Sequence, residues 1–113
     1  MRENFKLMES NPSYVVLTAK EDNLVVGSVM GVICLDLVGK CKPFMVIENV
    51  VVKSTWRGRG IGAMLMEEIE KIGRKENCYY TMLVSGGNRK DAHQFYKAIG
   101  YNLDFVQGLK KYL

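Results

Sequence analysis

One short junction constrains this chain more than any other feature. From Arg57 to Gly62, three glycines and two arginines occupy six consecutive positions. The run before it, Phe44–Val52, is almost continuously apolar and rich in β-branched residues, which is typical of a buried strand. After the junction, apolar residues recur at helical spacing at Ile61, Leu65, Ile69 and Ile72. The first amide groups of such a helix lack partners and attract anions, so the junction suits a diphosphate.

The segments around the junction predict a sheet. Tyr14–Thr18 and Leu24–Leu37 are β-rich, and the turn residues Glu21–Asn23 between them predict a hairpin. The helix should end near Asn77, and Tyr79–Val84 predicts another strand. Because a strand-helix-strand crossover is right-handed, the two strands that flank the helix should be parallel neighbours.

A second helix is expected near the end of the chain. Asn88, followed by Asp91, is typical of a capped helix start, and Gly100 stands where a left-handed C-terminal cap belongs. The buried stripe of this helix would consist of Ala92, Phe95, Tyr96 and Ile99. Two later runs, Phe105–Val106 and Leu109–Leu113, predict one or two final strands. The expected fold class is therefore mixed α/β.

Composition narrows the function classes. With 113 residues, 48% of them apolar and 25% charged, the chain resembles one ordinary globular domain. No segment reaches the apolar length of a membrane span or of a secretory signal, so a cytoplasmic protein is expected. The net charge of +4 is scattered rather than gathered in a basic stripe, which disfavours nucleic acid as the partner. The three cysteines lack CxxC spacing, so we expect reduced thiols and no metal site.

Three kinds of anion site share a glycine-rich helix start. The Walker loop requires Gly-Lys-Ser/Thr, which does not follow Gly62. The dinucleotide fingerprint GxGxxA fits Gly58–Ala63, but that fingerprint follows directly on its strand and needs an acidic residue at the end of the next strand. Neither condition is met here. The third is R-x-x-G-x-G, which is read at Arg57, Gly60 and Gly62.

Two longer stretches carry a family resemblance. "IENVVVKSTWRGRGIGAMLMEEIE" and "SGGNRKDAHQFYKAIGY" resemble, in the right order, two motifs of the GNAT acetyltransferases, and the similarity runs from about Tyr14 to the C-terminus. The resemblance implies a mixed, mostly antiparallel sheet with splayed parallel central strands and flanking helices. It also implies acetyl-CoA as co-substrate, with its pantetheine arm between Phe44–Val52 and Tyr79–Val84.

The resemblance implies a set of cofactor-binding residues. Main-chain groups of the strand at Val50, Val51 and Val52 would meet the pantetheine arm, and the amides of the junction would hold the pyrophosphate. Further contacts would come from Asn88 and Tyr96. The junction residues concerned are Arg57, Gly58, Arg59, Gly60, Ile61, Gly62 and Ala63.

The implied reaction is direct attack of a primary amine on the acetyl thioester. Glu48 is the candidate base, because it would share an apolar strand face with Phe44, Val46, Val50 and Val52, where desolvation raises the pKa of a carboxyl. Alternatively, Glu48 is a structural carboxylate paired with a lysine or arginine. Tyr96 would donate a proton to the departing sulfur, or serve in the core alone. We interpret Cys34, Cys41, Met64 and Met66 as packing residues.

The chain departs from the family pattern at its start. We expect a single acyl-CoA-binding domain over residues 1–113 that lacks the usual first strand and first helix, with Met1–Ser10 as a remnant of the second helix. The sheet edge left open could pair with a second copy as a homodimer, or two copies could exchange C-terminal strands. The acceptor would be an amine of a small molecule or a protein. The alternative function is a non-catalytic acyl-CoA-binding or regulatory module.

Overall fold

The computed structural model describes residues 9–113, so most of the helix remnant expected at 1–10 lies outside the described residues. The chain divides into two compact units, residues 1–83 and 84–113, and each is described by itself. Among the described residues, the first unit holds a mixed sheet and the long helix α2 (Ile61–Lys75), and the second holds the short helix α3 (Lys90–Ala98). This mixed composition confirms the expected fold class.

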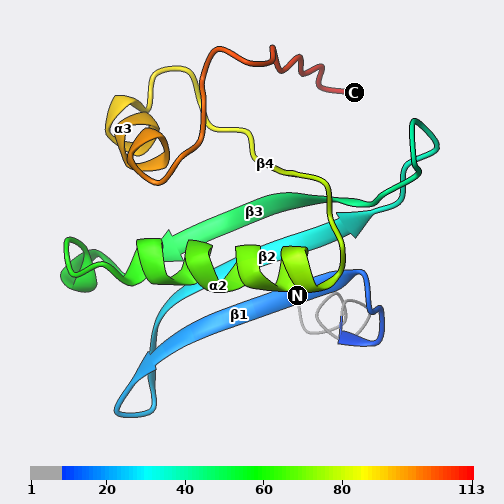
Figure 1. The fold of residues 1–113 in the computed structure, drawn as a ribbon. Helices are drawn as coiled ribbons and strands as arrows, with labels where there is room; N and C mark the ends of the chain where they lie inside the picture. Colours follow the sequence, from blue (N-terminus) through cyan, green and yellow to red (C-terminus); the bar gives the residue numbers. More distant parts are fainter. Residues whose placement is uncertain (1–8) are drawn as a thin grey trace. The chain divides into compact units, whose positions relative to one another are not determined.

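The first unit is built on a four-stranded sheet with the order β1-β2-β3-β4 (Figure 1). Its strands are β1 (Tyr14–Glu21), β2 (Leu24–Cys34), β3 (Phe44–Val52) and β4 (Thr81–Met82). β1 and β2 form the expected hairpin, and both residues of its turn have positive φ, 48° at Asp22 and 68° at Asn23. β2 and β3 are antiparallel, whereas β3 and β4 are parallel, as the crossover rule predicted. β1 forms an edge of this sheet among the described residues, and pairing with a second copy there stays a prediction.

One helix covers one face of this sheet. After the short 3-10 helix η1 (Ser54–Trp56), α2 (Ile61–Lys75) runs along the strands (Figure 1). The core lies between helix and sheet, where the side chains of Val26, Val29, Met45, Ile47, Leu65, Met66 and Ile69 are almost fully buried. Gly27 permits this close approach, because a Cβ there would stand 3.1 Å from both Ile61 and Leu65. Met66 is core, as expected, but Met64 is 51% exposed, so its interpretation as a packing residue was wrong.

A β-bulge divides β3 into two halves. Ser28 lies opposite Val51 and Met30 lies opposite Glu48, so β3 carries one extra residue between these pairs. Asn49 absorbs the irregularity with a φ of 56°, a left-handed conformation that asparagine tolerates. Because the extra residue reverses the alternation of side chains, Glu48 does not share a face with Val50 and Val52. The apolar face expected around Glu48 is wrong in that respect.

Several predicted strands are shorter than expected. β2 ends at Cys34, because Asp36 accepts a hydrogen bond from the Val38 amide at 3.1 Å and turns the chain. β4 contains only Thr81 and Met82 of the predicted Tyr79–Val84. The Tyr79 side chain is 76% exposed, although its amide donates to the main-chain oxygen of Pro43 at 2.8 Å.

The second unit contains the helix α3 (Lys90–Ala98). Its N-cap residue is Arg89 rather than Asn88, and no side chain caps it, so the predicted capped start was wrong. Gly100 has a φ of 103°, as the predicted left-handed cap requires. No strand follows α3 in the described residues, and Leu109 is 92% exposed. The final strands were wrongly predicted because their apolar side chains find no partner face there.

Among the described residues, no helix combines the length and the apolar character needed to cross a bilayer.

Candidate functional site

The start of α2 presents unpaired amide groups. The first amide that bonds within the helix is that of Met64, which donates to the Gly60 oxygen at 3.0 Å. The amides of Ile61, Gly62 and Ala63 precede it and have no carbonyl four residues back within the helix. No side chain caps this end, and its first turn contains no acidic residue. The free amides and the helix dipole therefore favour an anion.

Two glycines of the junction have a left-handed backbone. Gly58 has a φ of 76° and Gly60 a φ of 80°. A Cβ at either position would meet nothing within 4 Å, so free space is not what selects glycine. The backbone conformation selects it, because other residues are strained in this region.

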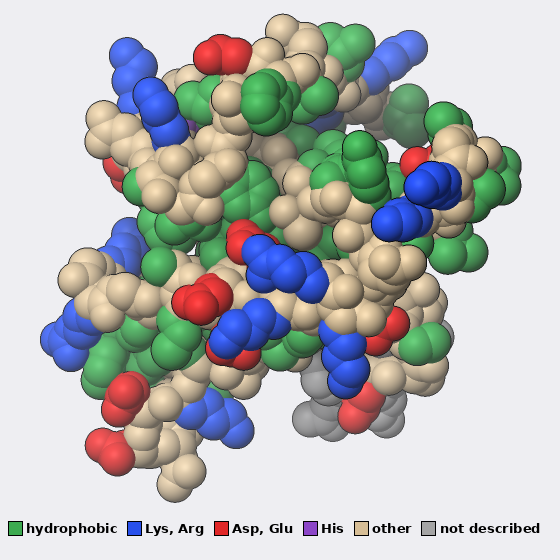
Figure 2. Space-filling model, in the orientation of Figure 1, with side chains coloured by type: hydrophobic (Ala, Val, Ile, Leu, Met, Phe, Trp, Pro, Cys, Tyr) green, Lys and Arg blue, Asp and Glu red, His purple; other side chains and the backbone are tan. Residues whose placement is uncertain are grey.

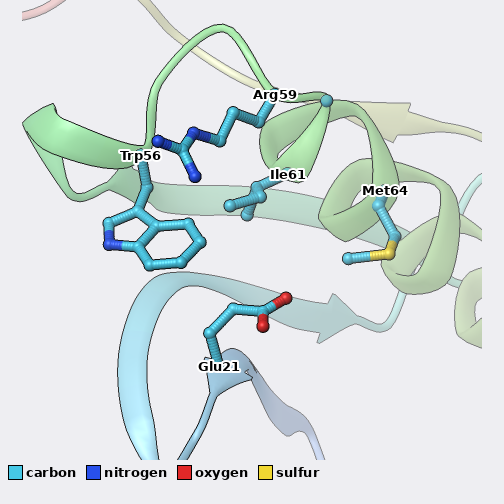
Figure 3. A pocket seen from close by; sticks show the side chains of 6 residues that line it. Glu21, Trp56, Arg59, Ile61 and Met64 are labelled. Atoms are coloured by element: carbon cyan, nitrogen blue, oxygen red, sulfur yellow. The ribbon is translucent and has the colours of Figure 1, made fainter.

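Both arginines of the junction contact the protein itself. The Nε of Arg57 donates to the main-chain oxygen of Val52 at 3.2 Å, which ties the loop to the end of β3. The guanidinium carbon of Arg59 lies 4.5 Å from the ring centroid of Trp56 (Figure 3). Trp56 was not predicted as a site residue, although an arginine three positions after a tryptophan can stack on its ring.

A shallow hollow adjoins this stack. It has a volume of about 340 Å³ and lies between the tip of the β1–β2 hairpin and the start of α2. Figure 3 shows Glu21 on one side of it, with Trp56 and Arg59 opposite. The lining residues are Glu21, Trp56, Arg59, Gly60, Ile61 and Met64. Among them, Glu21, Trp56 and Met64 had no site role in the sequence analysis. Glu21 could not have been predicted, because only the fold brings the hairpin to the helix start.

The second half of β3 turns main-chain groups away from β2. The Met45 amide donates to the Tyr80 oxygen at 3.0 Å, so the main-chain groups of Met45 point toward β4. Past the bulge, Val51 lies opposite Ser28 and the Lys53 amide donates to the Val26 oxygen at 2.7 Å. Alternation then directs the main-chain groups of Val50 and Val52 to the side away from β2.

These main-chain groups are not part of the parallel ladder. The described pairing of β3 with β4 is limited to Met45 with Thr81 and Val46 with Met82. Val50 and Val52 follow beyond it, and of their groups the Val52 oxygen already accepts from Arg57. The Val52 amide and the main-chain groups of Val50 remain available to an extended ligand. Val51, the third strand residue predicted to bind the cofactor, has its main chain in the β2 ladder and an exposed side chain.

Glu48 lies on the face of β3 turned away from α2 and is exposed. The neighbouring residues therefore do not desolvate its carboxyl as the sequence had suggested. No ion pair to Glu48 exists among the residues that the structure describes, so the structural alternative gains no support either. A bound substrate would have to supply any burial.

Tyr96 belongs to the second unit and is half-buried on α3. Its ring makes edge contacts with Phe95 and Tyr101, at centroid distances of 5.1 and 6.1 Å. Burial raises the pKa of its phenol above the ordinary value, although the Arg89 guanidinium opposes the shift. The hydroxyl is therefore protonated at neutral pH, as a proton donor must be, although the raised pKa makes it a weaker acid than an exposed tyrosine.

Two further polar residues of the second unit precede α3. Asn88 lies in an exposed turn, where its Oδ1 would stand 3.4 Å from a Cβ at Gly86. Ser85 differs, because its Oγ is buried and has no hydrogen-bond partner among the described residues. A buried hydroxyl without a partner is rare in folded proteins and often marks an absent polar ligand or water.

The Cys78 thiol is not poised for nucleophilic chemistry. All three cysteines are free. Burial, with Glu76 and Cys34 adding to it, raises the pKa of the Cys78 thiol and keeps it neutral. Cys41 is exposed in the β2–β3 loop, so its interpretation as a packing residue was wrong.

Comparison with known proteins identifies the family. The model of the acetyltransferase (GNAT) family matches residues 1–101. The chain belongs to this family. This confirms the resemblance seen in the sequence, and the mixed sheet with its parallel β3–β4 pair is the fold of its GNAT neighbours.

Solved structures of GNAT proteins resemble this chain over nearly its whole length. A protein assigned as an acetyltransferase in Agrobacterium tumefaciens str. C58 is 26% identical, with a TM-score of 0.90 over 97% of this chain and 76% of that one. A transcriptional regulator from Bacillus halodurans C-125 is 24% identical, with a TM-score of 0.93 over 99% and 74%. Glucosamine-6-phosphate N-acetyltransferase from Arabidopsis thaliana is 21% identical, with a TM-score of 0.86 over 98% and 76%. The last two likenesses show the fold alone.

The left-handed start of α2 yields a stability prediction. Gly60→Ala should lower the free energy of unfolding by about 1–2 kcal/mol, because its φ of 80° strains any residue with a Cβ. Gly73→Ala in the same GNAT helix should raise it by about 0.5–1 kcal/mol, since its nearest contact, 3.7 Å from Met45, is ordinary. Urea unfolding of both variants measures this. Shifts of the same sign would contradict the assigned backbone.

Proposed function

We propose that this GNAT protein transfers an acetyl group from acetyl-CoA to a primary amine, within one acyl-CoA-binding domain that spans residues 1–113. The observation that carries the proposal is the junction itself. A helix start with free amides follows, after η1 and a short glycine-rich loop, a strand in which the Val52 amide and the main-chain groups of Val50 are unpaired. The helix start suits a diphosphate, and the strand suits the amide-bearing arm attached to it.

The chemistry of the donor set fits this co-substrate. The amides of Ile61 to Ala63 are neutral donors aligned with a helix dipole, as a pyrophosphate requires. Val50 and Val52 offer backbone groups of the kind that an extended amide pairs with. When bound, acetyl-CoA would supply an activated thioester, and the protein would orient it.

In the proposed reaction, the amine nitrogen forms a bond to the acetyl carbon while the carbon–sulfur bond breaks. Glu48 would take the proton of the amine, directly or through water, because an ammonium cannot attack. Tyr96 would give its proton to the departing sulfur, which its protonated state at neutral pH allows. A main-chain amide of β3 would polarise the carbonyl. The roles of Tyr96 and Asn88 rest on the family motif.

The acceptor is proposed only as a class, an amine of a small molecule or of a protein. One neighbour is named for a phosphorylated amino sugar, and this suggests small sugar amines as the first acceptors to test. The alternative function is a non-catalytic acyl-CoA-binding or regulatory module. The exposure of Glu48 favours this alternative, and another neighbour is named a transcriptional regulator.

A nucleic-acid-binding function receives no support from the face shown in Figure 2. The outward surface of α2 carries acidic and basic side chains together, and no basic stripe runs along it. Lys71 lies 3.1 Å from Glu68, and Arg74 lies 3.9 Å from Glu70. Mixed pairs of this kind neutralise one another and do not attract a polyanionic backbone.

Calorimetric titration with acetyl-CoA tests the proposed function, with NAD and ATP as controls at the same salt. We expect saturable binding of acetyl-CoA alone, followed by acetylation in an amine screen. Gly60→Glu should abolish binding, because it places a carboxylate at the anion site. Gly39→Glu is the matched control, since Gly39 also has positive φ and open space but lies outside the junction. Absence of acetyl-CoA binding would refute the proposal, and binding without turnover would favour the regulatory alternative.

Ser85 yields a stability prediction for the second unit. Ser85→Ala should leave thermal stability unchanged or raise it, because it removes a buried hydroxyl that has no partner among the described residues. Thermal unfolding curves of the variant and the wild type measure this. A clear loss of stability in the variant would contradict the unpaired state of the hydroxyl.

The role of Glu48 is tested by the pH dependence of turnover. Glu48→Gln should lower kcat by about 10²-fold to 10⁴-fold and remove the acidic limb of its profile, because the base is lost. Glu67→Gln, on the outward surface of α2, is the matched control. An acidic limb that persists unchanged in Glu48→Gln would exclude Glu48 as the base.

A further inference from the structure

The two arginines of the junction stand in different situations. The Nε of Arg57 is engaged with the Val52 oxygen at 3.2 Å, which spans the loop between β3 and α2. Arg59 makes no hydrogen bond or ion pair among the described residues. Its only described partner is the Trp56 ring, 4.5 Å from the guanidinium carbon. Arg57 therefore ties the loop, and Arg59 holds an unneutralised charge beside the helix start.

A stack on an aromatic ring leaves a guanidinium able to bind anions. The ring occupies one face of the planar group, whereas the N–H donors point outward from its edge. The side chain of Arg59 is exposed, so these donors are accessible. Stacking also restricts a long side chain that would otherwise sample many rotamers. The Arg59 side chain then loses less conformational entropy when an anion binds.

Trp56 has few other structural tasks in the described residues. It is half-buried at the end of η1, a helix of three residues whose other two members are exposed. It is not among the buried core residues between α2 and the sheet. Its ring instead lines the hollow beside α2, directly against Arg59 (Figure 3).

We propose that Trp56 is a positioning residue of the anion site, which holds the Arg59 guanidinium beside the free amides of α2 so that both meet the same diphosphate. The inference rests on the proposed acyl-CoA function and adds a division of roles between the arginines. Arg57 shapes the loop through the Val52 oxygen. Arg59 supplies the charge, and Trp56 sets where that charge lies.

Glu21 explains why such positioning is needed. Its carboxylate lines the opposite side of the same hollow, on the tip of the β1–β2 hairpin, and forms no described ion pair. A flexible Arg59 would be drawn toward this carboxylate, and its charge would then be lost to a ligand. The stack on Trp56 holds the guanidinium on the junction side.

The test compares acetyl-CoA binding and steady-state kinetics in Trp56→Ala, Trp56→Phe, Arg59→Gln and the double variant Trp56→Ala with Arg59→Gln. Trp56→Ala should weaken acetyl-CoA binding about 3-fold to 10-fold and raise its KM similarly, with kcat unchanged. Trp56→Phe should restore much of the affinity. Because both residues act through one charge, the double variant should bind no more weakly than Arg59→Gln alone. Arg74→Gln, at the other end of α2, is the matched control for charge.

The outcomes separate this inference from the proposed function. If the wild type does not bind acetyl-CoA, the proposed function fails, and the inference fails with it. If the wild type binds but Trp56→Ala binds equally well, or if the two substitutions weaken binding additively, only the inference is overturned. Thermal unfolding of each variant identifies any that have lost their fold. If Trp56→Ala does not fold, Trp56→Phe provides the test instead. A folded Trp56→Phe protein that keeps the aromatic ring but binds acetyl-CoA much more weakly than the wild type would also overturn the inference.

Discussion

The packing of α2 against the sheet is the contact on which the rest of the first unit depends. Leu65, Met66 and Ile69 are buried against β2 and β3, and Gly27 lets the helix approach the strand closely. This contact fixes where the helix axis lies and, with it, the direction of the free amides at its start. The left-handed Gly60 then allows the chain to turn from η1 into that fixed helix. The position of the proposed anion site is thus set by the packing of the core.

The sequence predicted the parts of the fold that depend on local pattern. The hairpin, the bounds of β3, the course of α2 and the parallel β3–β4 pair all follow from periodicity, turn residues and the handedness of crossovers. It did not predict the bulge at Asn49, because one residue in a left-handed conformation leaves no mark on an apolar run. The bulge nevertheless decides which side chains share a face of β3 with Glu48. The length of β4 was also hidden, since strand pairing is decided by partners that are distant in sequence.

In the candidate site too, the sequence predicted local features but not contacts between distant residues. The glycines and arginines of the junction were found from their spacing, and their role in cofactor binding stays a prediction. The sequence could not show that Arg57 and Arg59 have different partners, since both are basic residues one glycine apart. Nor could it show that Glu21 faces the start of α2, because only the folded hairpin brings Glu21 there. The sequence therefore predicted which charged residues occupy the junction, but not which groups their side chains contact or face.

The bulge of β3 has a consequence for how this protein can diverge from its relatives. Beyond Asn49, the strand offers amide and carbonyl groups, which every residue except proline possesses in full. Mutations can exchange the side chains of Val50 and Val52 without changing those groups, provided that the strand keeps its path. An insertion or deletion near Asn49 would instead exchange the groups that face outward. Chain length in this short segment should therefore be under stricter constraint than residue identity.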